Sequence, residues 1–132
     1  MILLTGARGQ LGLEFQATFR EQGISWIATD RPELDITDAD QVRRFVETHD
    51  ITGIINCAAY NNVDQAEAEP EACRAVNTLA PGLLAGAARE KGVPFVTYST
   101  DFVFDGESDR PYVEIDPPAP RSVYGQSKLD GE

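Results

Sequence analysis

Cysteine, histidine and basic residues are scarce in this sequence. Two cysteines, Cys57 and Cys73, are too few for a disulfide framework, and without a cluster of further cysteines or histidines they form no metal-site pattern. Lysine and arginine number 11 against 22 acidic residues, and the net charge of −11 argues against binding to nucleic acids or anionic membranes. We therefore expect no metal and no polyanionic partner.

Long apolar runs are missing as well. None approaches the roughly 20 residues that a membrane span needs, and the start, MILLTGARG, has neither a basic leader nor a long apolar core typical of a signal peptide. The composition, 42% hydrophobic and 25% charged, is typical of a globular domain. These features predict a soluble, reduced, cytoplasmic protein whose 132 residues form one domain with a buried core.

Short apolar runs alternate with segments of helical periodicity. The runs predict buried strands at 2–5, 25–30, 53–60 and 94–101, and the periodic segments predict helices at 10–22, 35–50, 71–92 and 122–132. Residues 106–121 contain four prolines and little periodicity, which indicates a loop. Because alternating strands and helices form βαβ units, we predict an α/β fold with a doubly wound parallel sheet over residues 1–132.

Two local predictions concern the helices. Thr37, followed three residues later by Asp40, resembles a capping box at a helix start. Pro81 lies four residues after Asn77 in the helix predicted at 71–92 and, lacking an N–H, cannot bond to the Asn77 carbonyl. That carbonyl would lie either at a harmless kink or beside a water on a proton-relay path.

A glycine pattern joins the first predicted strand to the first predicted helix. TGARGQLG places Gly6, Gly9 and Gly12 in G-x-x-G-x-x-G spacing, in the strand–turn–helix context that dinucleotide-binding turns require. Gly6 would form the tight turn, Gly9 would let the backbone approach a pyrophosphate, and Gly12 would let helix and strand pack closely. The helix N-terminus favours phosphate. We therefore favour a dinucleotide site, which includes Gln10 and Leu11, over a turn that serves packing alone.

The second predicted strand ends on an acid, Asp30. Its carboxylate could accept hydrogen bonds from the adenosine ribose, which favours NADH, whereas Arg31 could bind a 2′-phosphate, which favours NADPH. Both choices stay open. Asp35 and Ile36 lie either beside the adenine or in a simple turn. The end of the third predicted strand either lines the same groove or packs in the core, through Ala58, Ala59 and Tyr60.

A tyrosine and a lysine four residues apart share one face of the last predicted helix. A free tyrosine has a pKa of about 10, and the ammonium of Lys128 would lower the pKa of Tyr124. Tyr124 could then protonate a carbonyl that receives hydride, and Lys128 could also hold the nicotinamide ribose. Thr100, where the fourth predicted strand ends, could donate to the same oxygen. Y-x-x-x-K alone is weak, but together with the glycine turn it favours catalysis over packing.

Five segments together resemble the extended short-chain dehydrogenase/reductase family: TGARGQLG, NCAAY, VDQAE, YSTDFVFDG and VYGQSKLDGE. More narrowly, STDFVFDG and the 24 residues from Thr100 to Tyr124 resemble the dTDP-4-dehydrorhamnose reductase branch. The resemblance implies an NAD(P)-binding Rossmann fold, NADPH or NADH as cofactor, and dTDP-rhamnose biosynthesis by reduction of the 4-keto group of dTDP-4-dehydro-L-rhamnose. It also implies that Thr100, Tyr124 and Lys128 are catalytic.

Members of that family are longer than this sequence. The resemblance therefore implies a truncated chain that holds the cofactor domain and lacks the C-terminal substrate half, with weak cofactor binding and little or no turnover of its own. The expected partners are a nucleotide-sugar substrate and, as one option, a second copy of the chain. Two alternatives stay open: a non-catalytic dinucleotide-binding regulatory subunit, and an epimerase or dehydratase of the same fold. The complete catalytic trio favours the reductase.

Overall fold

The helices and strands alternate along the chain largely as the sequence predicts. The computed structural model describes residues 1–132. Two units of the chain can be distinguished. We call Met1–Ala59 with Ala80–Tyr98 the sheet unit, and Tyr60–Leu79 with Ser99–Glu132 the helical unit.

The sheet unit contains four parallel strands in the order β2-β1-β3-β4. They are β1 (Ile2–Thr5), β2 (Trp26–Thr29), β3 (Gly53–Asn56) and β4 (Phe95–Thr97). The chain moves from β1 to β2 on one side and then crosses to β3 on the other, so the direction of winding reverses between β1 and β3. This topology confirms the predicted α/β class with a doubly wound parallel sheet.

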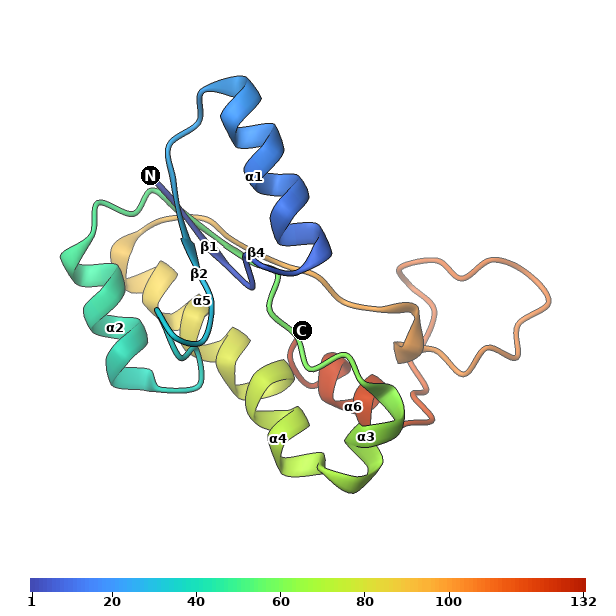
Figure 1. Ribbon diagram of the computed structural model, residues 1–132. Coiled ribbons are helices and arrows are strands. Elements are labelled where there is room, and N and C mark those ends of the chain that lie inside the picture. Colours follow the sequence, from blue (N-terminus) through green and yellow to red (C-terminus); the bar gives the residue numbers. More distant parts are fainter. The chain divides into compact units, whose positions relative to one another are not determined.

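Helices cover both faces of this sheet. Helix α1 (Gln10–Gln22) lies on one side, and α2 (Ala39–Thr48) and α5 (Ala80–Lys91) lie on the other (Figure 1). Neighbouring side chains of β1 explain the arrangement, because successive strand residues point to opposite faces. Leu3 belongs to the α2–α5 side, Leu4 belongs to the α1 side, and both are fully buried.

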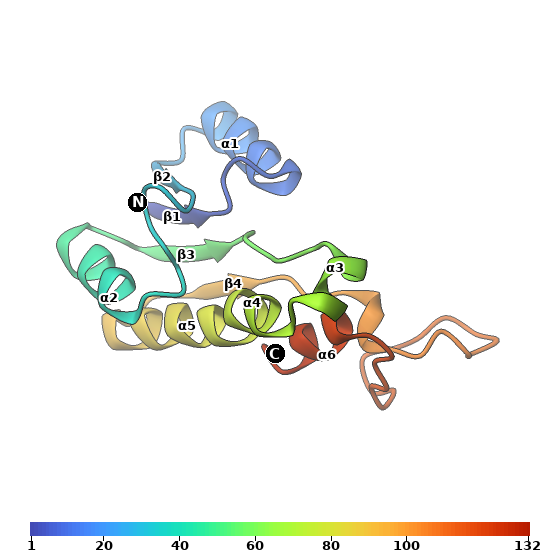
Figure 2. The ribbon, with the colours of Figure 1, turned by 60° about the horizontal axis from the view of Figure 1, so that its bottom comes forward.

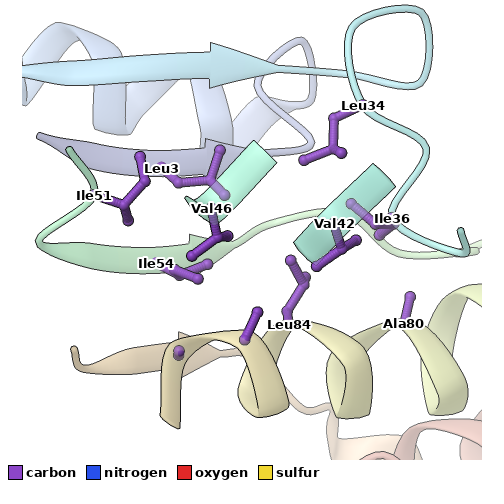
Figure 3. Packing of buried hydrophobic residues seen from close by; sticks show 11 residues of the cluster. Leu3, Leu34, Ile36, Val42, Val46, Ile51, Ile54, Ala80 and Leu84 are labelled. Atoms are coloured by element: carbon purple, nitrogen blue, oxygen red, sulfur yellow. The ribbon is translucent and has the colours of Figure 1, made fainter. Parts of the chain in front are cut away.

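The larger hydrophobic core fills the space between the sheet and helices α2 and α5. Figure 3 shows its side chains converging from the strands, from the loop before α2 and from both helices. Its buried members are Leu3, Leu34, Ile36, Val42, Val46, Ile51, Ile54, Ala80, Leu84, Ala87 and Ala88. Since each fully buried leucine, isoleucine or valine contributes about 1.5–3 kcal/mol, this cluster is the main stabilising element of the sheet unit.

Helix α2 begins one residue later than the predicted capping box implies. Its N-cap is Asp38, whose side chain accepts hydrogen bonds from the N–H groups of Asp40 and Gln41, both at 3.0 Å. The prediction of Thr37 as the capping residue is therefore wrong. Thr37 instead donates both its N–H and its hydroxyl to the carboxylate of Asp35.

The helical unit contains short elements only. They are α3 (Val63–Ala68), α4 (Pro70–Arg74), the π-helical segment η1 (Ala75–Leu79), the 3₁₀ turn η2 (Asp101–Val103) and α6 (Val123–Leu129). Figure 2 shows α3, α4 and α6 grouped together, with the predicted loop extending from them. None of the helices in residues 1–132 combines the length and apolar character that a membrane crossing requires.

The single helix predicted at 71–92 appears as three consecutive pieces, α4, η1 and α5. The π-helical segment contains Asn77 and ends two residues before Pro81, which has no N–H to bond to the Asn77 carbonyl. That carbonyl lies against the backbone of Gly131, just after α6. The proline therefore changes the helical geometry at Asn77, as its missing N–H leads one to expect.

Candidate functional site

The glycine turn after β1 lies directly against the end of β3. Gly6 has a φ of +66°, and a β-carbon there would overlap the backbone nitrogen of Ala58 and lie 2.6 Å from the Cys57 carbonyl carbon. A β-carbon on Gly12 would lie 2.7 Å from the Cα of Ala7. Both glycines are therefore required by close backbone packing, and the turn lies at the point where the winding of the sheet reverses.

Gly9 differs from the other two glycines. A β-carbon there would meet only the Gly6 carbonyl oxygen, at 3.3 Å, and the backbone is extended, with φ −75° and ψ 167°. Gly9 is the N-cap of α1, yet no side chain caps this helix and its first turn contains no acidic residue. Gln10 and Leu11 are exposed in the same turn. The open N-terminus of α1 suits an anionic group such as a phosphate.

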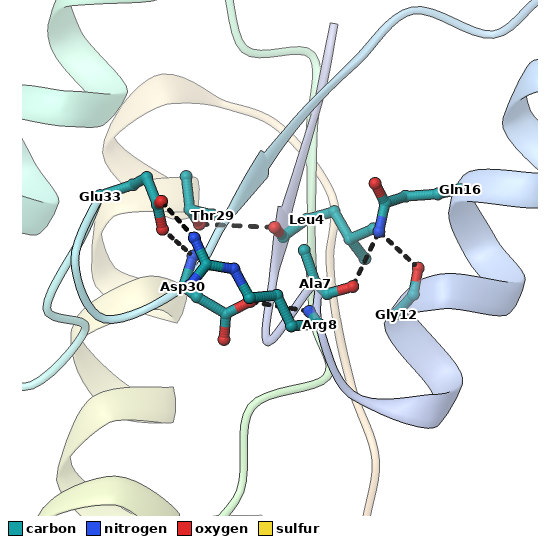
Figure 4. Close-up of polar contacts among 8 residues, drawn as sticks. All are labelled: Leu4, Ala7, Arg8, Gly12, Gln16, Thr29, Asp30 and Glu33. Atoms are coloured by element: carbon teal, nitrogen blue, oxygen red, sulfur yellow. Dashed lines mark hydrogen bonds and ion pairs between the residues drawn. The ribbon is translucent and has the colours of Figure 1, made fainter.

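A glutamine that the sequence analysis did not single out holds this turn in shape. Gln16 Nε2 donates to the carbonyl oxygens of Ala7, at 2.7 Å, and Gly12, at 3.3 Å (Figure 4). These bonds join the body of α1 to the turn that precedes it. The only feature of the sequence that could have indicated this role is the position of Gln16 four residues after Gly12, one helical turn along α1.

The end of β2 carries a network of three charged residues. Asp30, predicted as the ribose acid, accepts the Arg8 backbone N–H at 2.7 Å through Oδ2. The Arg8 guanidinium donates to Glu33 Oε1 at 2.6 Å, and the Asp30 N–H donates to Glu33 Oε2 at 3.0 Å (Figure 4). The sequence predicted Asp30 but neither Arg8 nor Glu33, because the link between them joins residues 25 positions apart.

The predicted phosphate ligand Arg31 pairs with Asp35, with 3.4 Å between Nε and Oδ2. Hydrogen bonds from the Thr37 hydroxyl and N–H, together with the Arg31 charge, hold the pKa of Asp35 below its ordinary value. The Ile36 side chain belongs to the hydrophobic core. Asp35 and Ile36 thus lie in a turn, which is one of the two predicted alternatives. Their contact with an adenine stays a prediction.

Asn56, at the end of β3, is a buried polar centre that the sequence analysis did not single out. Its Oδ1 accepts the Thr5 hydroxyl at 2.6 Å and the Ala58 N–H at 3.2 Å, and its Nδ2 donates to the Thr97 hydroxyl at 3.2 Å. It therefore joins the carboxyl ends of three neighbouring strands. Nearby, burial raises the pKa of the Cys57 thiol to about 11, which makes this cysteine a poor nucleophile at neutral pH.

The three predicted catalytic residues all belong to the helical unit. The Thr100 hydroxyl caps the 3₁₀ turn η2 by accepting the Phe102 N–H at 3.3 Å. Helix α6 packs against this turn, since a β-carbon on Gly125 would overlap the Phe102 carbonyl oxygen. The rings of Phe102 and Tyr124 meet edge to face with centroids 5.6 Å apart. The structure thus places the turn that bears Thr100 next to the helix that bears Tyr124.

Lys128 lies one helical turn after Tyr124 on α6 and is 9% exposed. Burial lowers the pKa of its ammonium, and the carboxylate of Glu132 and the thiol of Cys73 act in the opposite direction. Helix α6 is capped by Ser122, whose hydroxyl accepts the Gly125 N–H at 3.0 Å. The lysine is therefore held at a defined place on a capped helix.

A buried network of hydrogen bonds around Asn77 joins α6 to the segments that contain Tyr60 and Cys73. The Asn77 side chain accepts the Tyr60 N–H at 2.8 Å and donates to the Tyr60 carbonyl at 2.9 Å and to Ser127 Oγ at 3.0 Å. The Ser127 hydroxyl donates to the Tyr124 carbonyl at 2.7 Å and contacts the Cys73 sulfur at 3.1 Å. The sequence analysis considered only the Asn77 carbonyl and missed this side-chain role.

Tyr60, predicted to line a cofactor groove or pack in the core, is held at both ends. Its backbone bonds to Asn77, and its hydroxyl donates to the Glu69 carboxylate at 2.7 Å. That hydrogen bond, with some burial and the carboxylate charge, raises the pKa of Tyr60 to about 12. The phenol therefore stays protonated at neutral pH, and a contact with a cofactor stays a prediction.

The family follows from a comparison of the whole sequence with known families. The family described as the RmlD substrate-binding domain matches residues 1–132. The chain belongs to this family. The resemblance to the dTDP-4-dehydrorhamnose reductase branch is thereby confirmed at the level of the family, and several of the matching relatives carry that name.

Among the relatives of this RmlD-family chain, the probable low-salt glycan biosynthesis reductase Agl14 of Haloferax volcanii is 45% identical over 139 residues, covering 98% of the chain and 46% of the relative. The dTDP-4-dehydrorhamnose reductase of Streptomyces griseus is 45% identical over 130 residues, covering 98% and 43%. The crystal structure of the Bacillus anthracis dTDP-4-dehydrorhamnose reductase in complex with NADP is 38% identical, with a TM-score of 0.94, covering 98% and 46%. The chain thus spans about half the length of these relatives.

Proposed function

We propose that residues 1–132 form the NAD(P)H-binding part of an oxidoreductase that reduces the 4-keto group of dTDP-4-dehydro-L-rhamnose to dTDP-L-rhamnose. The observation that carries this proposal is the helical unit, where α6, the helix that bears Tyr124 and Lys128, packs against the turn capped by Thr100. The reductase names of relatives 45% identical to the chain support the same reaction type.

The donor set of the sheet unit fits a dinucleotide. The α1 N-terminus has no side-chain cap, and Gly9 leaves room for a pyrophosphate that a larger residue would fill. The Asp30 carboxylate, at the end of β2, can accept hydrogen bonds from an adenosine ribose. When bound, the reduced cofactor supplies hydride. Support from a relative comes from the Bacillus anthracis reductase, which was crystallised with NADP.

The helical unit supplies the proton. In the proposed reaction the Tyr124 hydroxyl gives its proton to the oxygen of the keto group as that oxygen becomes a hydroxyl. The Lys128 ammonium, on the same face of α6, stabilises the resulting phenolate. The Thr100 hydroxyl donates a hydrogen bond to the same substrate oxygen and so stabilises its developing negative charge.

The test has a binding arm and a chemical arm. Calorimetry with NADH and with NADPH should give a dissociation constant for at least one of them. With the chain in excess over a dTDP-4-keto-6-deoxysugar, NAD(P)H absorbance should fall and mass spectrometry should find the 4-hydroxy sugar. Tyr124→Phe should slow this single turnover by about 10²–10⁴-fold at unchanged cofactor affinity, whereas Tyr112→Phe, in the loop, should not.

Three outcomes would contradict the proposal. Absence of binding of either cofactor would refute it outright. Binding without reduction of any keto sugar in the panel, both by the chain alone and by the chain joined to the part of the Streptomyces griseus reductase that it does not match, would favour the regulatory subunit. A product that is epimerised or dehydrated, with no net consumption of NAD(P)H, would favour the epimerase or dehydratase alternative. The panel should include several dTDP-linked keto sugars, because the names of the relatives differ in the keto sugar that they state.

A further inference from the structure

The corner formed by the glycine turn and the loop after β2 has three hydrogen-bond donors that carboxylates already engage. Arg8 donates its backbone N–H to Asp30 and its guanidinium to Glu33, and Asp30 donates its own N–H to Glu33 (Figure 4). Each of these three donors faces a carboxylate oxygen at 2.6–3.0 Å. A ligand that takes one of these three donors must therefore displace a carboxylate.

The charge of the corner has the same consequence. Two carboxylates, of Asp30 and Glu33, face one guanidinium, of Arg8, which leaves one net negative charge. An adenosine 2′-hydroxyl can donate a hydrogen bond to a carboxylate such as Asp30. A 2′-phosphate carries about −1.5 to −2 charges and only accepts hydrogen bonds, so it is repelled by the carboxylates. The corner thus suits the hydroxyl of NADH better than the phosphate of NADPH.

Glu33 has two effects on this balance. Its Oε1 occupies the guanidinium of Arg8, which is otherwise the cation best placed in the glycine turn to bind a phosphate, with 68% of its side chain exposed. Its Oε2 occupies the Asp30 N–H. The next cation, Arg31, pairs with Asp35. Glu33 therefore both adds a negative charge and withholds the nearest positive one.

We infer that Glu33 is a specificity-determining residue that, by holding Arg8 beside Asp30, makes the chain prefer NADH to NADPH. The inference rests on the proposed dinucleotide function, and it names which of the two cofactors that site takes. It differs from the role expected of Asp30 alone, because it assigns the discrimination to a residue of the next turn and to its ion pair.

The test compares the dissociation constants of NADH and NADPH, measured by calorimetry, for the unmodified chain and for Glu33→Gln. The unmodified chain should bind NADH more tightly. In Glu33→Gln, the ratio of the NADPH constant to the NADH constant should fall by about tenfold, because one charge is lost and Arg8 is released. The matched control is Glu47→Gln, which removes the same charge from the exposed surface of α2 and should leave the ratio unchanged.

A second variant separates the released arginine from the simple loss of charge. In an Arg8→Gln background, Glu33→Gln should change the ratio by clearly less than tenfold, since no guanidinium is left to bind the phosphate. An unmodified chain that prefers NADPH, or an unchanged ratio in Glu33→Gln, would overturn the inference while leaving the proposed function intact. If neither dinucleotide binds, the proposed function and the inference both fail.

Discussion

Gly6 and Ala58 approach each other so closely that a β-carbon on Gly6 would overlap the Ala58 backbone nitrogen. This contact joins the turn after β1 to the end of β3, the two neighbouring strands between which the winding reverses. Gly6 also has a positive φ, +66°. Gly23, at the end of α1, has nearly the same φ, +67°, but nothing within 4 Å of a β-carbon. Substitution of Gly23 therefore tests the cost of the positive φ alone, whereas substitution of Gly6 adds the cost of steric overlap.

Gly6→Ala should destabilise the chain more than Gly23→Ala. The left-handed conformation alone costs about 1–2 kcal/mol for a residue with a side chain, which is the loss expected for Gly23→Ala. Gly6→Ala adds the overlap with Ala58, for a total loss of about 2–5 kcal/mol. Urea unfolding of both variants measures the difference, and equal losses would mean that the turn can move away from β3.

Gly9→Asp should affect stability and cofactor affinity in opposite directions. The extended backbone of Gly9 suits an N-cap residue, and an aspartate there would cap α1, which raises the free energy of unfolding by a few tenths of a kcal/mol. The same carboxylate would occupy the phosphate position and repel it, lowering dinucleotide affinity by about tenfold or more.

Gly82→Asp is the matched control for this charge. It adds one carboxylate on α5 at a position with nothing within 4 Å of a β-carbon, and it should leave dinucleotide affinity unchanged. Thermal unfolding and calorimetry on the same samples give both quantities. Unchanged affinity in Gly9→Asp would show that no phosphate binds at the α1 N-terminus.

Asn77→Asp should strongly destabilise the helical unit. The change removes the donors that bond to the Tyr60 carbonyl and to Ser127, and it buries a carboxylate where the native amide is 2% exposed. Buried polar groups left without partners and buried charges each cost several kcal/mol, so the expected loss is more than about 3 kcal/mol. Asn61→Asp, at an exposed position, should change stability by less than about 0.5 kcal/mol in urea unfolding.

Lys128 should make the stability of the chain depend on alkaline pH. Burial lowers its pKa in the folded chain below the ordinary value of 10.5. Between the two pKa values the unfolded chain binds more protons, so the contribution of Lys128 to stability rises with pH through this window and is constant below it. The stability of the native chain minus that of Lys128→Met should therefore rise as pH approaches 10.5. A flat difference would mean that the ammonium is solvated.

Local patterns predicted the elements well, whereas the roles of the candidate site residues stay predictions. The glycine spacing located the turn between β1 and α1, and the alternation of elements indicated the doubly wound sheet. The start of α2 was assigned one residue too early, because Thr37 and Asp38 are both good capping residues and only the hydrogen bonds of the folded chain distinguish them. The periodicity of the apolar residues likewise could not predict the π-helical geometry of η1, although Pro81 indicated where the regular helix would change.

By itself the sequence determined which backbone conformations each segment prefers, and with them the parallel sheet, the open helix start at Gly9 and the shared face of Tyr124 and Lys128. Only the tertiary structure decided which partners those residues take: Glu33 for Arg8, Ser127 for Asn77, the end of β3 for Gly6. The physical reason is the distance along the sequence over which each kind of interaction acts. Periodicity and spacing reflect interactions within a few residues, whereas these contacts join segments 25 to 52 positions apart that meet only after the chain has packed.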